Sequence, residues 1–318
     1  MRTSVLTIIL GLAAAPAFAT PWPSETIRIV VGFTPGGSSD LVARLIAPLV
    51  GQDLGATVIV ENMPGAASTI AAQHVADADP DGYTFFLSNV SANGIAPFTY
   101  PELGYDPVAD FDDVTVLGYI PAVLLASKTS SVDSLEAFIA EAKGSTEPVL
   151  FGSGGHGTMN HVTGELLKLK GDLNIEHIAY KGSAEAMNDL LAGVIDFQID
   201  ALTQNVGQIE AGAINALAIS TPERSPAAPD IPTFAELGLS EVVAFNWVGL
   251  SAPSGTPADV IERFYAATHK AMLNKEIQEQ FSTWGMFHVD STPAEAEAFV
   301  SAEVAKWGET ISQAGAFK

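Results

Sequence analysis

The sequence of 318 residues contains no cysteine at all. This absence excludes disulfide bonds, thiolate metal sites and cysteine nucleophiles together. Basic residues are scarce as well, with 14 Lys and Arg against 37 Asp and Glu and a formal net charge of −23. Such a balance argues against a nucleic-acid partner and against attachment to anionic lipid. The acidity is either solvated surface charge or the mark of a cationic ligand, and both interpretations are open at this point.

Long apolar runs are also missing beyond the N-terminus, since none approaches the roughly 20 residues that a membrane span needs. The N-terminus itself combines Arg2, an apolar stretch over residues 5–15, and an A-x-A cleavage site at residues 17–19. This order is typical of a secretory signal peptide. We therefore expect residues 1–19 to be a signal peptide cleaved near Ala19. A short membrane anchor is the alternative.

The remaining chain has the material for a large core, because 47% of all residues are hydrophobic. Residues 27–33, 57–60 and 83–87 are apolar, β-branched or aromatic runs that predict strands, and residues 41–50 have helical spacing. A strand–helix alternation with short polar connections favours a parallel sheet with helices on both faces. The first part of the chain is therefore predicted to be an α/β unit.

A second unit of the same construction follows. Strands are expected at residues 149–151, 174–179 and 194–199, with helices between them at residues 159–170 and 186–191. The glycine-rich loops of the two units occupy matching places, as do Gly65 and Gly182 after later strands. Two α/β lobes are thus expected, each with loops at the carboxyl ends of its strands. The apolar runs at residues 114–127 and 214–220 are predicted to pass between the lobes as a hinge.

The stretch GFTPGGSSD, residues 32–40, connects the first strand to the first helix. Backbone N–H groups in the first turn of a helix have no partner within the helix, and the dipole adds roughly half a positive charge there. Glycines let the backbone approach a ligand, and Thr34, Ser38 and Ser39 add hydroxyl groups. The pattern indicates an anion site that needs no Lys or Arg. Simple capping of the helix by Ser39 or Asp40 is the alternative.

The glycine-rich loop of the second unit, GSGGHG at residues 152–157, also fits the dinucleotide fingerprint G-x-G-x-x-G. The acid expected about 20 residues further on would be Glu176. However, Glu176 lies inside an apolar strand pattern instead of at its end. An exported nicotinamide-dependent oxidoreductase using this loop is kept as an alternative.

The polar residues around this loop match no catalytic or metal-binding pattern. His156 and His161 are five residues apart, so they do not share one helix face as metal ligands would. Ser153 is not in a nucleophile elbow, because Phe151 stands where G-x-S-x-G requires glycine. We expect no metal, no cofactor and no catalytic residue. Asp200, at the carboxyl end of a predicted strand, is the carboxylate expected to face a cleft.

Several long stretches together resemble one known family. They are IRIVVGFTPGGSSDLVARLIAPLV (residues 27–50), FGSGGHGTMNHVTGEL (151–166), AYKGSAEAMNDLLAGVIDFQIDAL (179–202) and ALAISTPERSPAAPDIPTFAELGL (216–239). In this order, they resemble the substrate-binding proteins of tripartite tricarboxylate transporters, the Bug family of periplasmic receptors. The likeness covers essentially all of the chain after the signal peptide.

This resemblance implies an α/β, two-lobed periplasmic-binding-protein fold of the Venus-flytrap, type II-like kind. Each lobe would be a mostly parallel sheet flanked by helices, and crossing strands would form the hinge. Residues 20–121 together with 224–318 would form lobe 1, and residues 122–223 would form lobe 2.

The resemblance also implies which residues contact the ligand. In the family, two strand-to-helix loops grip a carboxylate through backbone amides, hydroxyls and ordered water. The matching positions are Phe33, Thr34, Gly37, Ser38 and Ser39 in the first loop; Ser153, Gly155, His156, Gly157 and Thr158 in the second; and Ser88, Asn89, Tyr180 and Asp200 at neighbouring strand ends. Thr34 stands where the family often has a second proline, and Ala201 where it often has asparagine. The contacts to the far end of the ligand therefore stay open.

The function that follows is a periplasmic solute-binding protein and not an enzyme. It would capture a small carboxylate (a di- or tricarboxylate or an aromatic acid) and deliver it to membrane subunits of the tripartite tricarboxylate type. A sensor protein is the alternative partner, and a cationic ligand is the alternative cargo. We expect a monomer that does not bind nucleic acid.

Overall fold

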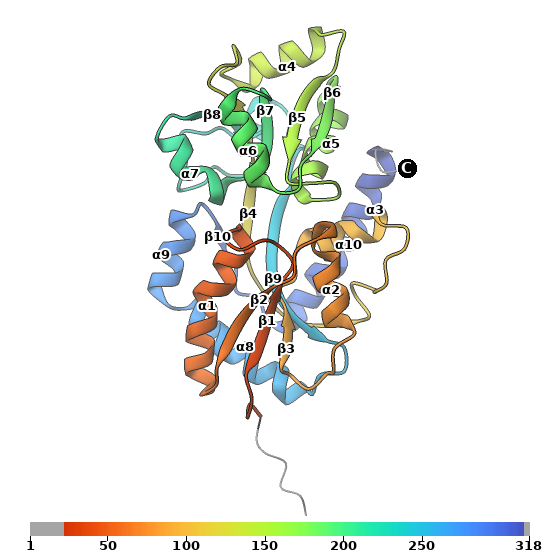
Figure 1. The fold of residues 1–318 in the computed structure, drawn as a ribbon, viewed down its shortest axis with the longest axis vertical. Coiled ribbons are helices and arrows are strands. Elements are labelled where there is room, and N and C mark those ends of the chain that lie inside the picture. Colours follow the sequence, from red (N-terminus) through yellow and green to blue (C-terminus); the bar gives the residue numbers. More distant parts are fainter. Residues whose placement is uncertain (1–21, 315–318) are drawn as a thin grey trace, which may run out of the picture.

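One long strand, β4 (Phe111–Ser127), connects the two halves of the molecule in the computed structural model, which describes residues 22–314 (Figure 1). Up to Pro121, β4 pairs with β9 (Phe245–Pro253). From Ala122 onward it pairs with β7 (Phe197–Ala201) and β8 (Ile214–Ile219). The partner strands therefore change between Pro121 and Ala122. We propose that the boundary between the two lobes lies here, between Pro121 and Ala122.

The first lobe is built around three parallel strands in the order β2 (Val58–Asn62), β1 (Ile27–Val31) and β3 (Thr84–Phe86). Strand β9 joins antiparallel beside β3, and the short β10 (Phe287–His288) pairs with β4. The helices of this lobe are α1 (Ser38–Leu54), α2 (Thr69–Ala76), α8 (Ala258–Met272) and α9 (Lys275–Thr283).

Alternating side chains fix which helix covers which face of this sheet. Phe85 points to the side of α1 and α8, where its ring stacks on Phe264 with 3.7 Å between centroids. Phe86, the next residue, packs instead with Val30 and with Ala71 of α2. Because successive side chains of a strand face opposite ways, the run of apolar residues in β3 serves both layers. The predicted sheet with helices on both faces is confirmed.

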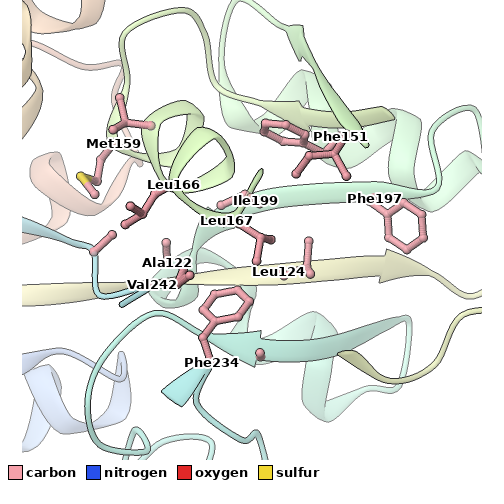
Figure 2. Packing of buried hydrophobic residues seen from close by; sticks show 14 of the residues in the cluster. Ala122, Leu124, Phe151, Met159, Leu166, Leu167, Phe197, Ile199, Phe234 and Val242 are labelled. Carbon is pink, nitrogen blue, oxygen red and sulfur yellow. The ribbon is translucent and has the colours of Figure 1, made fainter. Parts of the chain in front are cut away.

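The second lobe repeats this arrangement with the parallel strands β5 (Val149–Ser153), β6 (Ile175–Ala179) and β7. Its helices are α4 (Leu135–Gly144), α5 (Met159–Gly171), α6 (Ser183–Ala192) and α7 (Leu202–Glu210). Figure 2 shows how Phe151, Leu124 and Ile199 of the strands pack with Leu167 of α5. The two-lobed α/β architecture is therefore the one expected.

The C-terminal helix α10 (Pro293–Ala314) belongs to the core of both halves. It packs on β4, on α5 and on the π-helical turn η2 (Val90–Ile95), which continues into α3 (Ala96–Thr99). Trp307 of α10 is fully buried, in the same cluster as Phe151 of the second lobe. One side of the molecule thus has a continuous apolar core across the lobe boundary.

The hinge prediction needs one correction. Strand β8 pairs along β4 within the second lobe and does not pass between the lobes. The chain instead returns through residues 220–244, which include the 3-10 turn η3 (Ala235–Leu237) and lead into β9. The apolar sequence of β8 reflects its burial next to β4 within the second lobe, and not a passage between the lobes.

The predicted signal peptide, residues 1–19, lies outside the described residues. Within residues 22–314, no helix has both the length and the apolarity for a membrane crossing.

Candidate functional site

Five strand-to-helix loops surround a cavity of about 770 Å³. They follow β1 and β2 in the first lobe and β5, β6 and β7 in the second. Within each lobe these strands are parallel, so their carboxyl ends meet at one edge of the sheet. Open α/β sheets bind ligands at this edge. The cavity is therefore the candidate site.

The first loop leaves the start of α1 exposed to the cavity. Helix α1 begins at Ser38, and its N-cap Gly37 provides no side-chain cap. Ser38 and Ser39 both line the cavity although their side chains are largely buried. Their position in the first helical turn places N–H groups without intrahelical partners beside the hydroxyls. The anion-site interpretation of this loop is the one that the geometry favours over capping.

Asp40 fixes the conformation of this loop through hydrogen bonds to its carboxylate. Its Oδ2 accepts the N–H of Gly36 at 2.8 Å, and its Oδ1 accepts Nδ2 of Asn62 at 2.8 Å. Burial alone would raise the pKa of Asp40, but hydrogen bonds from Arg44, Gly36 and Asn62 and the charge of Arg44 lower it overall. The carboxylate is thus ionised and is balanced by Arg44, whose Nε lies 2.9 Å from Oδ2.

The second loop, residues 153–158, is held in a compact turn by hydrogen bonds between its own residues. Thr158 is the N-cap of α5, and its Oγ1 donates to the carbonyl oxygen of Gly155 at 2.8 Å. Gly155 has a φ of +135°, a conformation that an L-residue rarely adopts. Gly155, His156 and Thr158 line the cavity. The amino end of α5 therefore faces the amino end of α1 across the same space.

A third loop, after β2, was not among the predicted contacts. Ala66, Ala67 and Ser68 all have positive φ values, of 45°, 52° and 77°. Consecutive left-handed residues other than glycine are strained, and such strain clusters at functional sites. The turn lies against Gly32, where a Cβ atom would come within 1.8 Å of Ser68 Oγ. Only glycine at position 32 lets this turn reach the cavity.

Charged groups are few around the cavity. Helices α6 and α7 also begin there, and Lys181 is the only Lys or Arg among the lining residues of the described chain. The two acids are Glu185 and Asp200. Glu185 accepts the backbone N–H of Lys181 at 3.1 Å and so serves the start of α6.

Asp200 lies where three helices of the second lobe begin. Its Oδ1 accepts Nδ2 of Asn160 at 3.1 Å, and its Oδ2 accepts Nδ2 of Asn205 at 3.0 Å. Burial raises the pKa of Asp200, against the hydrogen bonds from Asn205, Ser183 and Asn160. These donors hold the carboxyl group at the wall of the cavity, where it is 2% exposed.

The structure brings most of the expected ligand contacts together. The residues that line the cavity are Phe33, Thr34, Gly37, Ser38, Ser39, Gly155, His156, Thr158, Tyr180 and Asp200. Ser88, Asn89, Ser153 and Gly157 do not line it. Asn89 lies one layer behind, where its Nδ2 donates to Ser68 Oγ at 3.0 Å. Ser153 is fully buried with its Oγ 2.7 Å from Nε2 of His177.

Other lining residues were missed by the sequence reasoning. They include Gly65, Ala66, Ala67 and Ser68 of the third loop, Asn160 of α5, Ser183 of α6, Gln204 of α7 and Asn246 of β9. The matching positions of Gly65 and Gly182 were the available signal for the third loop and for the loop before α6. No pattern around Asn246 marks it in the sequence.

The geometry also bears on the dinucleotide alternative. Residues 152–157 do connect a strand to a helix, as the fingerprint requires. Glu176, however, is the second residue of β6 and is paired with Leu150 near the amino end of β5. It is therefore at the opposite end of the parallel strands from the loop.

Comparisons with known proteins agree with these observations. The model of the family described as tripartite tricarboxylate transporter family receptor matches residues 42–316. Protein BugT of Bordetella pertussis is 34% identical over 316 residues, which are 98% of this chain and 97% of BugT.

Among solved structures, MatC from Rhodopseudomonas palustris with bound malate has a TM-score of 0.85 and 30% identity, covering 91% of this chain and 100% of MatC. An R. palustris protein solved with adipate has a TM-score of 0.88 and 31% identity, covering 92% of this chain and 98% of that protein.

Proposed function

Because the chain belongs to the tripartite tricarboxylate transporter receptor family, we propose that it captures a small organic carboxylate between its lobes in the periplasm. It then delivers this ligand to membrane subunits of the tripartite tricarboxylate type. Family and fold are those of solute-binding proteins, and no catalytic role is proposed for any residue.

The observation that carries the proposal is the convergence of helix N-termini on one cavity. Helices α1, α5, α6 and α7 all begin at its wall. Each contributes partial positive charge and N–H donors that have no partner within the helix. Since Lys181 is the single Lys or Arg of the described lining, backbone dipoles supply most of the attraction for an anion. A carboxylate fits this chemistry, whereas a cation does not.

The overall charge of −23 does not oppose this ligand. Surface charges are screened beyond about 8 Å at physiological salt. A hydrogen bond to a charged group is worth about 1.5–3 kcal/mol net. A few of them from two loops account for a micromolar dissociation constant, which corresponds to about −8 kcal/mol.

The hydrogen-bond donors lie on both lobes, so a ligand that contacts all of them favours closure of the lobes. Gln204 of α7 donates to Ser38 Oγ of the first lobe across the cavity, with 3.4 Å between nitrogen and oxygen. A ligand that contacts α1 and α5 together binds the closed arrangement better than an open one. This difference in affinity is what drives closure.

Two of the solved relatives hold malate and adipate, which are both dicarboxylates. We extend this chemistry to the present cavity and propose a di- or tricarboxylate or an aromatic acid as ligand. Lobe 1 would consist of residues 20–121 and 224–318, and lobe 2 of residues 122–223. Export by a signal peptide at residues 1–19 belongs to the same proposal.

A thermal-shift panel tests this function. Citrate, malate, succinate, adipate and benzoate are added separately to the purified protein, together with spermidine as a cationic probe. We expect at least one acid, and not spermidine, to raise the melting temperature by several degrees. Stabilisation by spermidine alone, or by none of the compounds, would contradict the proposal.

A further inference from the structure

Behind the second loop lie two histidines, His161 and His177, that the ligand contacts do not explain. His161 of α5 and His177 of β6 are stacked with 3.8 Å between ring centroids and 17° between ring planes. The ring of His156, in the loop itself, lies 5.0 Å from that of His161. Within residues 22–314 no cluster of His, Asp and Glu has the arrangement of a metal site. The stacked pair therefore needs another role.

The two stacked rings are bonded to opposite ends of the loop. Nδ1 of His161 accepts the backbone N–H of Gly157 at 3.1 Å. Nε2 of His177 lies 2.7 Å from Ser153 Oγ. Ser153 Oγ in turn contacts both the N–H and the carbonyl oxygen of Gly155, each at 3.3 Å. Each histidine thus holds one end of the turn whose middle lines the cavity.

The loop is the kind of segment that needs such support. Gly155 and Gly157 have φ values of +135° and +72°, which favour glycine at both positions. Because glycine has no side chain, neither residue can fix the loop by side-chain contacts of its own. The open surface of the loop faces the cavity. The contacts that fix the loop conformation must therefore come from residues on its buried side. His161 is one of these residues, and it is only 4% exposed.

The bond to Gly157 requires a neutral ring at His161, because a protonated Nδ1 cannot accept. Burial, reinforced by the neighbouring His177 and His156, lowers the pKa of His161 to about 2. Burial, with His156 as second cause, lowers the pKa of His177 to about 4. The proton of the neutral His161 ring is then on Nε2, 3.8 Å from Oε1 of the buried Glu165.

Charged and titratable groups near the pair include Glu165 and Tyr100. Glu165 follows His161 on α5, and burial raises its pKa, opposed by Lys168 and reinforced by Glu176. Tyr100, the residue after α3, approaches the loop with its OH 3.5 Å from the carbonyl oxygen of His156.

We propose that His161 and His177 are positioning residues that hold loop 153–158 in its carboxylate-binding shape through Gly157 and Ser153. The inference rests on the proposed function for what the loop binds, but not for how the loop is held. Ser153, expected as a ligand contact, serves in this account as the link between His177 and the loop.

Conservative and non-conservative variants separate positioning from packing. Asn at position 161 keeps an acceptor near the place of Nδ1, and Gln at position 177 keeps a polar atom near the place of Nε2. Leu at either position fills similar space without the hydrogen bond. His74, an exposed residue of α2, supplies the matched control His74→Leu.

Two measurements are made on each folded variant: amide hydrogen exchange of residues 153–158 without ligand, and adipate binding by calorimetry. We expect His161→Leu and His177→Leu to speed exchange in the loop and weaken adipate binding, each at least tenfold. His161→Asn, His177→Gln and His74→Leu should stay within threefold of wild type. Wild-type behaviour of the Leu variants, or equal losses in the Asn and Gln variants, would overturn the proposal.

A measurement on the unaltered protein covers the case in which the Leu variants do not fold. Nitrogen-15 spectra of the histidines at pH 7 should show His161 protonated on Nε2 and unprotonated on Nδ1. The opposite tautomer would also overturn the proposal. If wild-type protein binds none of the panel acids while exchange follows the expected order, the proposed function fails and the positioning role stands.

Discussion

Asp113 on β4 illustrates how burial sets the behaviour of a single carboxyl group. Its Oδ1 accepts the hydroxyl of Ser251 at 2.6 Å. Burial raises its pKa to about 6, with Glu297 and Asp112 adding to the rise against the bond from Ser251. The unfolded chain has the ordinary value near 3.8. The folded state thus binds the proton more tightly, and stability falls as the pH rises from about 4 to about 6.

This gives a prediction for Asp113→Asn. The amide cannot ionise, so we expect the variant to be more stable than wild type above pH 6, by at most about 3 kcal/mol. The gain should disappear below pH 4. Urea unfolding at pH 4.5 and pH 8 measures it, with the exposed Asp133→Asn as control. A gain that is the same at both pH values would show that ionisation of Asp113 is not its cause.

The strained turn at residues 66–68 gives a second prediction. A methyl group at position 32 would come within 2.7 Å of the Cα atom of Ser68, so Gly32→Ala must move the turn. We expect at least a tenfold loss of carboxylate affinity, measured by calorimetry. Unchanged affinity in Gly32→Ala would remove the third loop from the site.

Ala67→Gly replaces an alanine in the left-handed conformation and should stabilise the protein by up to about 1 kcal/mol.

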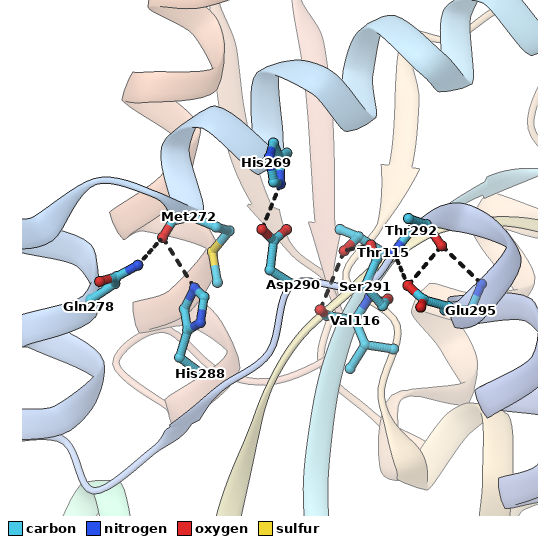
Figure 3. Close-up of polar contacts among 10 residues, drawn as sticks. All are labelled: Thr115, Val116, His269, Met272, Gln278, His288, Asp290, Ser291, Thr292 and Glu295. Carbon is cyan, nitrogen blue, oxygen red and sulfur yellow. Dashed lines mark hydrogen bonds and ion pairs between the residues drawn. The ribbon is translucent and has the colours of Figure 1, made fainter.

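At the scale of elements, the segment between β10 and α10 fastens the C-terminal helix to the hinge strand (Figure 3). The ladder between β4 and β9 is irregular near Thr115 and Val116. There Ser291 Oγ accepts the N–H of Val116 at 2.8 Å, and its carbonyl oxygen accepts Thr115 Oγ1 at 2.7 Å. His269 of α8 contacts Asp290 of the same segment.

We therefore expect Ser291→Ala to destabilise the protein by about 1–2 kcal/mol, because the N–H of Val116 loses its acceptor in a partly buried place. Equilibrium unfolding in urea measures the effect. Ser301→Ala, on the exposed side of α10, is the control and should change stability by less than half as much. Equal effects of both substitutions would mean that the bond at the irregular ladder adds nothing.

Elements with a clear apolar pattern were predictable. The strands at residues 27–31, 58–62 and 84–86 and the helices at 159–171 and 183–192 lie close to their expected places. Helix α7 was missed because LTQNVGQIE is mostly polar, and η2 was missed because Gly94 and Pro97 interrupt residues 90–99. Both of these elements contact the second lobe or the cavity, so tertiary packing decides their form.

The candidate site was predictable only where loops carry paired glycines and hydroxyls. Both glycine-rich loops line the cavity. The third loop has alanines in left-handed conformations, which no sequence rule anticipates. Ser153 carries the right chemistry for a ligand contact but is turned to His177, and only the packed structure shows that.

For the whole molecule, we expect the two lobes to close when the ligand binds. The chain has no cysteine, so Glu141→Cys on α4 and Glu262→Cys on α8 allow two labels to be attached without competing sites. We expect a saturating carboxylate to shorten and narrow the distance distribution between labels on the two lobes, measured by pulsed electron resonance. Identical distributions with and without bound ligand would contradict closure by the ligand.

We propose that backbone dipoles and hydroxyls of two facing loops bind a carboxylate as an anion. Calorimetric titration of adipate and malate, each compared with its uncharged diamide, measures how much of the binding depends on the negative charge. We expect micromolar binding of at least one acid and at least 100-fold weaker binding of the matching amide. Equal binding of acid and amide would contradict it.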